Sequence, residues 1–150
     1  MLDLLEIPFK KNKFYYRRLD GTMTVAQRER AIGDFEERPD VLILLVSLKA
    51  AALGVNLTVA NHVVLMDLWW NPTTEEQAID RAHRIGQTRT VHITRLVIAG
   101  TVEDRILELQ DRKRAVVSAA LDEGGRPAGV GGSKLTMEDL KFLFEGEKTA

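Results

Sequence analysis

The sequence predicts an α/β domain in which helices cover both faces of a parallel sheet. Two short and continuously apolar runs, Val41–Val46 and Val63–Met66, are typical of strands buried on both sides of such a sheet. A third predicted strand, Val91–Ile98, carries apolar residues at intervals. Helical segments separate these runs, and strands that alternate with helices indicate a parallel sheet. No internal repeat is visible.

The remaining elements follow from helix-start signals and turn residues, taken in chain order. The first three are the end of an amphipathic helix at Met1–Ile7, a strand at Phe14–Leu19, and a helix from the capping box Thr24-x-x-Gln27 to about Glu37. A long helix runs from Thr101 to about Leu121. A last short helix begins at Thr136 and has a docking face of Leu140, Leu143 and Phe144. We therefore expect a lobe at residues 1–121, a glycine-rich linker at 122–134, and a docking helix with a tail at 135–150.

The composition is that of an ordinary folded domain, with 150 residues, 45% apolar and 29% charged. The chain has no cysteine, which excludes disulfides and thiolate metal sites and fits a reducing compartment. No apolar run approaches the length of a membrane span, and the first residues lack the cleavage pattern of a signal peptide. We expect no membrane partner and no protein-held metal site.

The net charge of −1 argues against a uniformly basic nucleic-acid binder, but the basic residues are clustered. One tract holds Lys10, Lys11, Lys13, Arg17 and Arg18, and a second holds Arg81, Arg84, Arg89 and Arg95, each without an intervening acid. The tracts could form a phosphate-facing patch. The alternative, weighted equally on charge alone, is that acids on nearby helices compensate them in space.

The stretch from Gln77 to Gly86 organises the rest of the chain. Read as a helix, it carries a polar stripe of Gln77, Arg81 and Arg84 beside a small apolar stripe of Ala78, Ala82 and Ile85. Gly86 then ends the helix, since glycine accepts the left-handed conformation. Two guanidinium groups one turn apart suit a phosphate or a carboxylate. The plainer alternative is a solvated face on which Asp80 pairs with Arg84.

The full string up to Gln87 resembles motif VI of the SWI/SNF-type ATPases, the DNA translocases of helicase superfamily 2. That family reads Q-x-x-D-R-x-H-R-I-G-Q, and every fixed position is present here. The resemblance implies a single RecA-like lobe with a C-terminal helical extension. It also implies that Arg81 and Arg84 act as arginine fingers on the γ-phosphate, that Gln77 orients water or phosphate, and that Asp80 lies at the nucleotide.

Residues 47–57 resemble motif V of the same family, S-L-K-A-G-G-x-G-x-N-L, with Ala51 and Ala52 in place of two glycines. The substitution is unfavourable if the loop needs positive φ, and harmless if the segment is a helical turn. The resemblance implies DNA-backbone contacts by Ser47 and Lys49 and nucleotide contacts by Gly54 and Asn56.

Two further segments resemble the family at the ends of predicted strands. Residues 18–22 match R-L-D-G-x, and residues 67–72 match D-x-x-W-N-P. The resemblance implies DNA contacts by Arg18, Gly21, Thr22 and Trp70. The alternatives are an ordinary turn and a tryptophan that anchors the core. Residues 134–144 resemble the chain end of the branch that contains the helicase-like transcription factor and related repair translocases.

The sequence contains neither G-x-x-x-x-G-K-[ST] nor D-E-A-H, so the phosphate loop and the magnesium ligands belong to a first lobe. We therefore interpret the chain as a fragment or truncated product that lacks the first strand of its lobe, and we expect it to be inactive alone. The intact protein is expected to use ATP and Mg2+ to translocate on double-stranded DNA, in repair or on nucleosomes, in the nucleus. The rival is a non-catalytic module that docks DNA or protein; a Rossmann domain is disfavoured because no G-x-G-x-x-G follows a strand.

Overall fold

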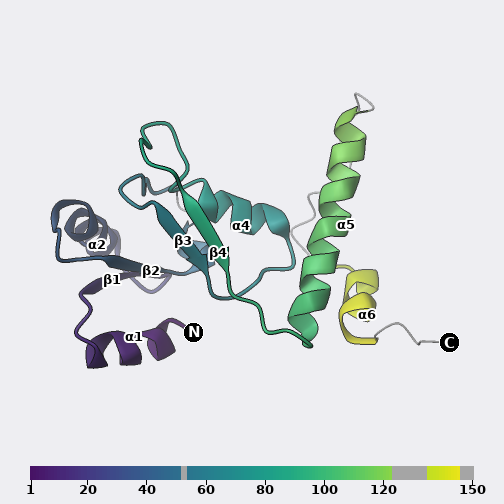
Figure 1. Ribbon diagram of the computed structural model, residues 1–150, viewed down its shortest axis with the longest axis horizontal. Helices are drawn as coiled ribbons and strands as arrows, with labels where there is room; N and C mark the ends of the chain where they lie inside the picture. Colours follow the sequence, from purple (N-terminus) through teal and green to yellow (C-terminus); the bar gives the residue numbers. More distant parts are fainter. Residues whose placement is uncertain (52–53, 123–134, 146–150) are drawn as a thin grey trace. The chain divides into compact units, whose positions relative to one another are not determined.

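The computed structural model describes residues 1–51, 54–122 and 135–145, and the predicted linker, apart from its first residue, therefore lies outside the described residues. The chain divides into two compact units, one formed by Met1–Asn61 with Asp80–Val91 and the other by His62–Ile79 with residues 92–150. Each unit contains one pair of parallel strands and its own helices (Figure 1). The predicted order of strands and helices is present.

In the first unit, β1 (Tyr16–Leu19) pairs in parallel with β2 (Ile43–Val46), with Leu19 opposite Val46. The crossover helix α2 (Val25–Glu37) begins at the predicted capping box, in which the Gln27 amide N–H donates to Thr24 Oγ1 at 3.3 Å and the Thr24 N–H donates to the Gln27 side chain at 2.8 Å. Leu19 and Ala31 are buried where α2 packs on the strands. The short helix α3 (Leu48–Ala51) follows β2.

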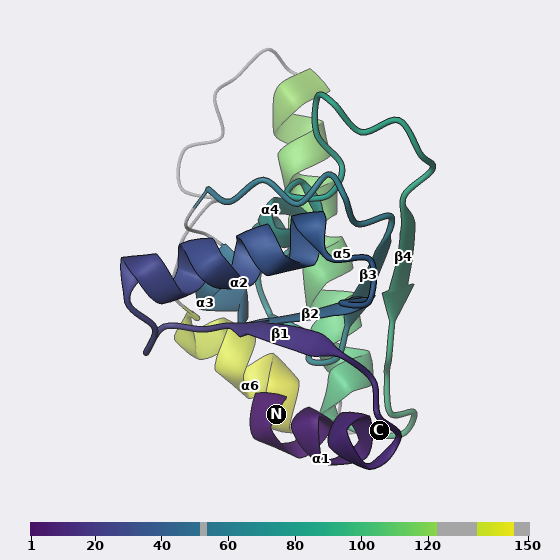
Figure 2. The same ribbon diagram turned by 90° about the vertical axis from the view of Figure 1, so that its left-hand side faces the viewer.

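Helix α1 (Leu2–Lys11) packs on the other side of β1 from α2 (Figure 2). Two residues after the end of α1, Lys13 has a left-handed φ of 57°; the Phe14 N–H donates to Phe9 O at 3.0 Å and the Lys13 N–H to Lys10 O at 3.2 Å. This hydrogen-bond pair is the Schellman arrangement, and the Phe9 and Phe14 rings supply its usual apolar contact at 6.2 Å. The Phe9 ring also lies 5.8 Å from the ring of Tyr16 on β1.

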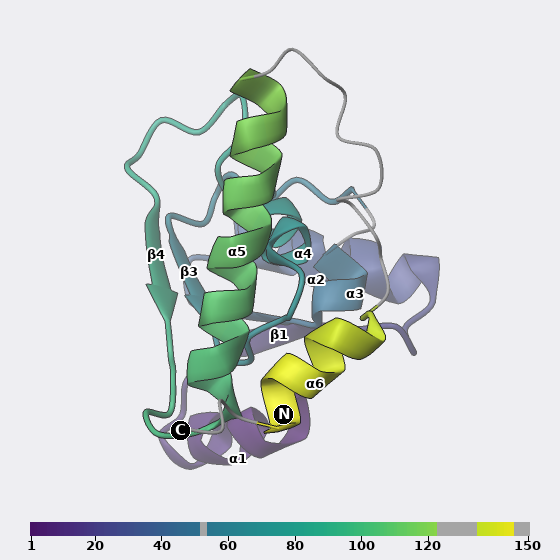
Figure 3. The ribbon, with the colours of Figure 1, turned by 90° about the vertical axis from the view of Figure 1, so that its right-hand side faces the viewer.

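In the second unit, β3 (His62–Leu65) pairs in parallel with β4 (His92–Arg95). The helices are α4 (Pro72–Ile79), α5 (Val102–Asp122) and α6 (Met137–Glu145), and Figure 3 shows α5 and α6 side by side. Leu109 and Leu143 are buried, and an ion pair of 3.1 Å joins Lys113 on α5 to Asp139 on α6. The predicted docking helix thus lies on α5 with Leu143 inward, whereas Leu140 and Phe144 of the predicted docking face are exposed.

The strands are shorter and less buried than the apolar runs predict. In β2 only Leu45 is buried and in β3 only Leu65, and every residue of β4 is exposed. The expectation of strands buried on both sides does not hold for β4, whose residues are all exposed, and it holds only in part for β2 and β3. Within the described residues, no helix combines the length and apolar character that crossing a membrane requires.

Candidate functional site

The carboxyl ends of β1 and β2 bring several predicted site residues to one edge of the first unit. The Ser47 N–H donates to Leu19 O at 3.0 Å, so the turn after β1 lies beside the start of α3. Ligands of parallel α/β sheets bind at such an edge. Gly21 and Thr22 are exposed in the first of these segments, and Lys49 is exposed in the second.

Asp20 organises the turn after β1. Its carboxylate accepts the Thr22 hydroxyl at 2.6 Å, the Thr22 N–H at 2.8 Å and Arg18 Nε at 2.6 Å. The Thr22 hydroxyl, then the Thr22 amide and Arg18, lower the pKa of Asp20 to about 2, so the carboxylate is charged at neutral pH. The Thr22 hydroxyl is thus oriented by Asp20 at the exposed edge of the sheet.

Arg18 is held by three carboxylates rather than presented alone to solvent. Besides Asp20, it donates to Asp3 at 2.5 Å and to Glu6 at 3.1 Å, both on α1. Lys10 and then Arg18 lower the pKa of Glu6 to about 2. Arg17 pairs with Asp34 of α2 at 2.6 Å in the same way. For Arg17, Arg18 and Lys10, the alternative of compensating acids on nearby helices is therefore the correct one.

Helix α3 shows why alanine is tolerated where the family has glycine. Ser47 caps this helix by accepting the Ala50 N–H at 3.2 Å, and the Ala51 N–H donates to Ser47 O at 3.0 Å. Ala51 is buried inside a regular helical turn, where alanine is favoured over glycine. Ala52 lies outside the described residues. Gly54 has a φ of +76°, which explains glycine at that position, and Asn56 beyond it is exposed.

The predicted helix from Gln77 to Gly86 is wrong, because α4 ends at Ile79. Gln77 lies in the last turn of α4, in the second unit, whereas Arg81 and Arg84 lie in a turn-rich segment of the first unit, here called the arginine loop (residues 80–91). Carbonyl groups that the helix would need are bonded elsewhere: Arg81 O accepts the Leu57 N–H at 2.8 Å, and Ala82 O accepts Gln87 Nε2 at 3.2 Å. The polar stripe therefore does not exist as a helix face.

The apolar stripe fails for the same reason. Ala82 is buried as predicted, but Ile85 is 99% exposed at the tip of the loop. Gly86 has a φ of +104°, so the predicted left-handed glycine is present, although it lies within the arginine loop and does not end a helix. The proposed pairing of Asp80 with Arg84 is also not among the ion pairs of the described residues.

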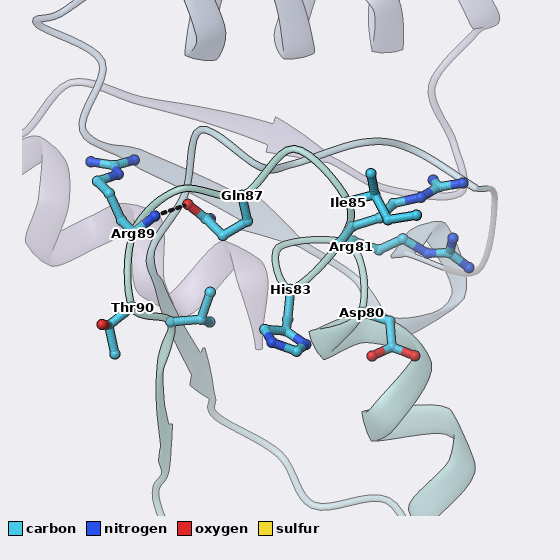
Figure 4. A pocket seen from close by; sticks show the side chains of 9 residues that line it. Asp80, Arg81, His83, Ile85, Gln87, Arg89 and Thr90 are labelled. Atoms are coloured by element: carbon cyan, nitrogen blue, oxygen red, sulfur yellow. Dashed lines mark hydrogen bonds between the residues drawn. The ribbon is translucent and has the colours of Figure 1, made fainter.

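The two arginines differ in how firmly they are held. Arg81 is half-buried, and its Nε donates to Ala51 O of α3 at 3.0 Å, which leaves the outer nitrogens of the guanidinium for a ligand. Arg84 is exposed and makes no side-chain hydrogen bond or ion pair among the described residues. Figure 4 shows the pocket along this loop, with Asp80 and His83 extending to one side and Arg81 to another. The pocket offers cationic donors to an anion.

Sequence reasoning included Gln87 in the motif VI string but gave it no role; its side chain ties the arginine loop to residues 58–60 of the segment after α3. Sequence reasoning missed a buried cluster in the second unit. Glu75, with no exposed surface, accepts the Trp69 N–H at 2.8 Å, Gln110 Nε2 at 2.8 Å and Arg95 Nε at 3.1 Å; we call this the Glu75 network. No local signal marks either feature, because the partners are distant in sequence.

Trp70, next to the Glu75 network, is half-buried and covered by an ammonium group. Lys113 Nζ lies 4.3 Å from the centre of the Trp70 ring and also pairs with Asp139. This cation–π contact joins the predicted DNA-facing tryptophan to α5 and α6. The tryptophan thus belongs to the second unit's packing while keeping part of its surface accessible.

The parallel strands, the crossover helix and the polar carboxyl edge define a RecA-like α/β lobe, as predicted. The family model for the helicase conserved C-terminal domain matches residues 1–86, and the chain belongs to this family. It is 56% identical over 146 residues to the helicase-like transcription factor CHR27 of Arabidopsis thaliana, covering 96% of this chain and 14% of that protein. It is 48% identical over 144 residues to the DNA repair protein RAD5A of the same plant, covering 95% and 13%.

Among solved structures, the crystal structure of the C-terminal part of the Fun30 ATPase domain is similar, with a TM-score of 0.71 and 40% identity over 73% of this chain and 35% of that one. The predicted relationship to SWI/SNF-type helicase-like proteins is thereby confirmed, including the branch of transcription-factor and repair proteins. The chain spans a small part of the length of the curated relatives that it matches.

Proposed function

We propose that this lobe completes the ATPase site of a double-stranded DNA translocase that acts in DNA repair or chromatin remodelling, in the nucleus. Arg81 and Arg84 serve as the arginine fingers, reaching the γ-phosphate of ATP held by a first RecA-like lobe, and Gln77 orients the water or the phosphate. Gly54, Asn56 and Asp80 lie at the nucleotide. The observation that carries the proposal is the exposed guanidinium of Arg84, which has no partner among the described residues.

The donor set of the arginine loop fits a phosphate and not a metal ion. Guanidinium groups bind phosphate oxygens with paired hydrogen bonds. Among the described residues there is no group of three His, Asp or Glu side chains that could hold a metal. ATP supplies the reacting phosphoryl group, and its Mg2+ ligands come from the first lobe, so the 150-residue chain by itself should not hydrolyse ATP.

DNA is proposed to bind at the carboxyl edge of β1 and β2 through its phosphates. The contacts at this edge come from Arg18, Gly21, Thr22, Ser47 and Lys49. Trp70 of the second unit is a separate proposed contact to DNA. The exposed ammonium of Lys49 is the strongest candidate, because Arg18 is already bonded to three carboxylates and the Thr22 hydroxyl donates its single proton to Asp20. Such contacts position a duplex without reading its sequence.

The test is steady-state ATP hydrolysis by the full-length protein with saturating DNA. Arg81→Ala or Arg84→Ala should lower kcat by roughly 10³–10⁵, or about 4–7 kcal/mol of transition-state stabilisation, while DNA affinity stays unchanged. The two losses should be less than additive, since both side chains serve one phosphate. Arg84→Lys should recover little, because an ammonium group lacks the planar fork.

Near-normal turnover in both single variants would show that these arginines are solvated side chains without a catalytic role. It would favour instead a non-catalytic module that docks DNA or protein. Arg38→Ala is the matched control, because Arg38 is an exposed arginine that pairs with Asp40 at 2.8 Å after the end of α2, and its loss should leave kcat unchanged.

A further inference from the structure

The side-chain amide of Gln87 uses all of its hydrogen-bonding groups inside the first unit. Nε2 donates to Ala60 O at 2.7 Å and to Thr58 O at 2.9 Å, with Ala82 O at a longer 3.2 Å. Oε1 accepts the Arg89 N–H at 2.9 Å, the bond drawn in Figure 4. Both Nε2 protons of Gln87 are therefore used within the first unit, and its bonds join two segments that are far apart in the sequence.

These bonds hold the part of the arginine loop that carries Arg84. The Gln87 N–H donates to Arg84 O at 2.9 Å, and the Arg89 guanidinium donates to Val59 O. On the other side of the loop, Arg81 O accepts the Leu57 N–H at 2.8 Å. Since no helix extends beyond Ile79 in this stretch, the shape of the loop depends on these tertiary hydrogen bonds.

We infer that Gln87 is a positioning residue for Arg84. Its amide fixes the arginine loop on residues 58–60, which follow the exposed Asn56, and so fixes the backbone from which the Arg84 side chain extends. This inference rests on the proposed function of Arg84. Its physical basis is preorganisation: a charged group held in place before the reaction needs no reordering during it, and a displacement of about 1 Å can cost about 100-fold in rate.

The chemistry at this position requires an amide. A glutamate of the same shape would direct a carboxylate oxygen at the carbonyls of Thr58 and Ala60, leaving them without their donor and placing like partial charges together. An asparagine is shorter by one methylene and cannot reach both carbonyls. Gln87→Glu also introduces a negative charge, and Thr88→Glu controls for the effect of that charge. The neighbouring Thr88 is exposed and makes no side-chain hydrogen bond among the described residues.

The experiment compares Gln87→Glu and Thr88→Glu in the full-length protein, each with and without Arg84→Ala. Gln87→Glu should lower kcat by about 10- to 100-fold, with the KM for ATP changed by less than about threefold, because a misplaced finger affects the transition state. On the Arg84→Ala background the same change should cost less than about twofold, since the residue that it positions is already absent. Thr88→Glu should be neutral on both backgrounds. Amide hydrogen exchange should rise in residues 80–91 of Gln87→Glu and stay unchanged in β1 and β2.

The outcomes separate this inference from the proposed function. Wild-type kcat in Gln87→Glu, or an equal loss with and without Arg84→Ala, would overturn the positioning role while leaving the finger assignment intact. A normal kcat in Arg84→Ala alone would overturn the proposed function, and the positioning role would fall with it. Loss of kcat in Thr88→Glu as large as that in Gln87→Glu would assign the effect to charge and also overturn the inference.

Discussion

Replacing Glu75 with glutamine should destabilise the chain, although the new side chain has the same shape. The Glu75 carboxylate has no exposed surface, and one of its oxygens accepts both the Trp69 N–H and Gln110 Nε2 while the other accepts Arg95 Nε. A glutamine can keep the first two bonds. Its amide nitrogen then faces Arg95 Nε, so two donors meet where a charge-assisted hydrogen bond was.

The expected loss follows from these contacts. A hydrogen bond between charged groups contributes about 1.5–3 kcal/mol, and Arg95, with 34% of its side chain exposed, regains part of this from water. We expect Glu75→Gln to cost about 2 kcal/mol of unfolding free energy, or about 4–8 °C in Tm for a chain of this size. Glu75→Ala also leaves the Trp69 N–H without its acceptor and Gln110 Nε2 with Trp69 O alone, and should cost about 3–5 kcal/mol.

The assay is urea unfolding followed by tryptophan fluorescence. The chain has two tryptophans, Trp69 and Trp70, and Trp69 is part of the Glu75 network, so the signal reports on the affected region. Glu76→Gln is the matched control: the adjacent Glu76 is 52% exposed and pairs with Arg114 at 3.4 Å, which predicts a loss below about 1 kcal/mol. Equal unfolding midpoints for the Glu75 and Glu76 variants would refute the reasoning.

Three further predictions concern the first unit. Lys13→Gly should raise the unfolding free energy by up to about 1 kcal/mol, because glycine adopts the left-handed φ of 57° without the steric cost that a side chain incurs. A lower midpoint of urea unfolding than that of wild type would contradict this. The pKa of Asp20 is about 2 in the folded chain against an ordinary value of 3.8, so the stabilisation from its carboxylate is present above about pH 4 and is lost as the pH falls through about 2. Asp20→Asn should therefore have a lower unfolding free energy than wild type at neutral pH and lose less of it on acidification; an equal loss of unfolding free energy with pH in both proteins would contradict this. Binding of a labelled duplex to the 150-residue chain should be weak and should fall steeply with salt, and Lys49→Ala should reduce the salt slope by about one; a slope that stays the same would remove Lys49 from the DNA contacts.

The order of strands and helices was predictable because it depends on local patterns. The Thr24 capping box lies within one turn of helix, and the α2 start follows from it directly. The glycine at position 86 was likewise predicted to be left-handed from its local context. Motif spacing was also sufficient to predict the family, which the comparison over residues 1–86 confirms.

The form of the candidate site could not be predicted, because distant partners decide it. The periodicity of residues 77–86 favours a helix, but the Leu57 N–H and the Gln87 side chain bind the carbonyls that this helix would use. The Glu75–Gln110 contact joins residues 35 apart in the sequence, and no hydrophobic pattern marks a buried carboxylate. Charge clustering alone also overstated the basic patch, since Arg17 and Arg18 are paired with acids on α1 and α2.

The affinity of the full-length protein for ADP with aluminium fluoride, in the presence of DNA, tests the arginine-finger assignment most directly. This complex mimics the charge of the transferring phosphoryl group, so a residue that acts on the transition state contributes to its binding. Arg84→Ala should weaken the complex by about 100-fold or more while the affinity for ADP alone stays within about threefold of wild type. Equal affinity of wild type and Arg84→Ala for the aluminium fluoride complex would contradict the assignment.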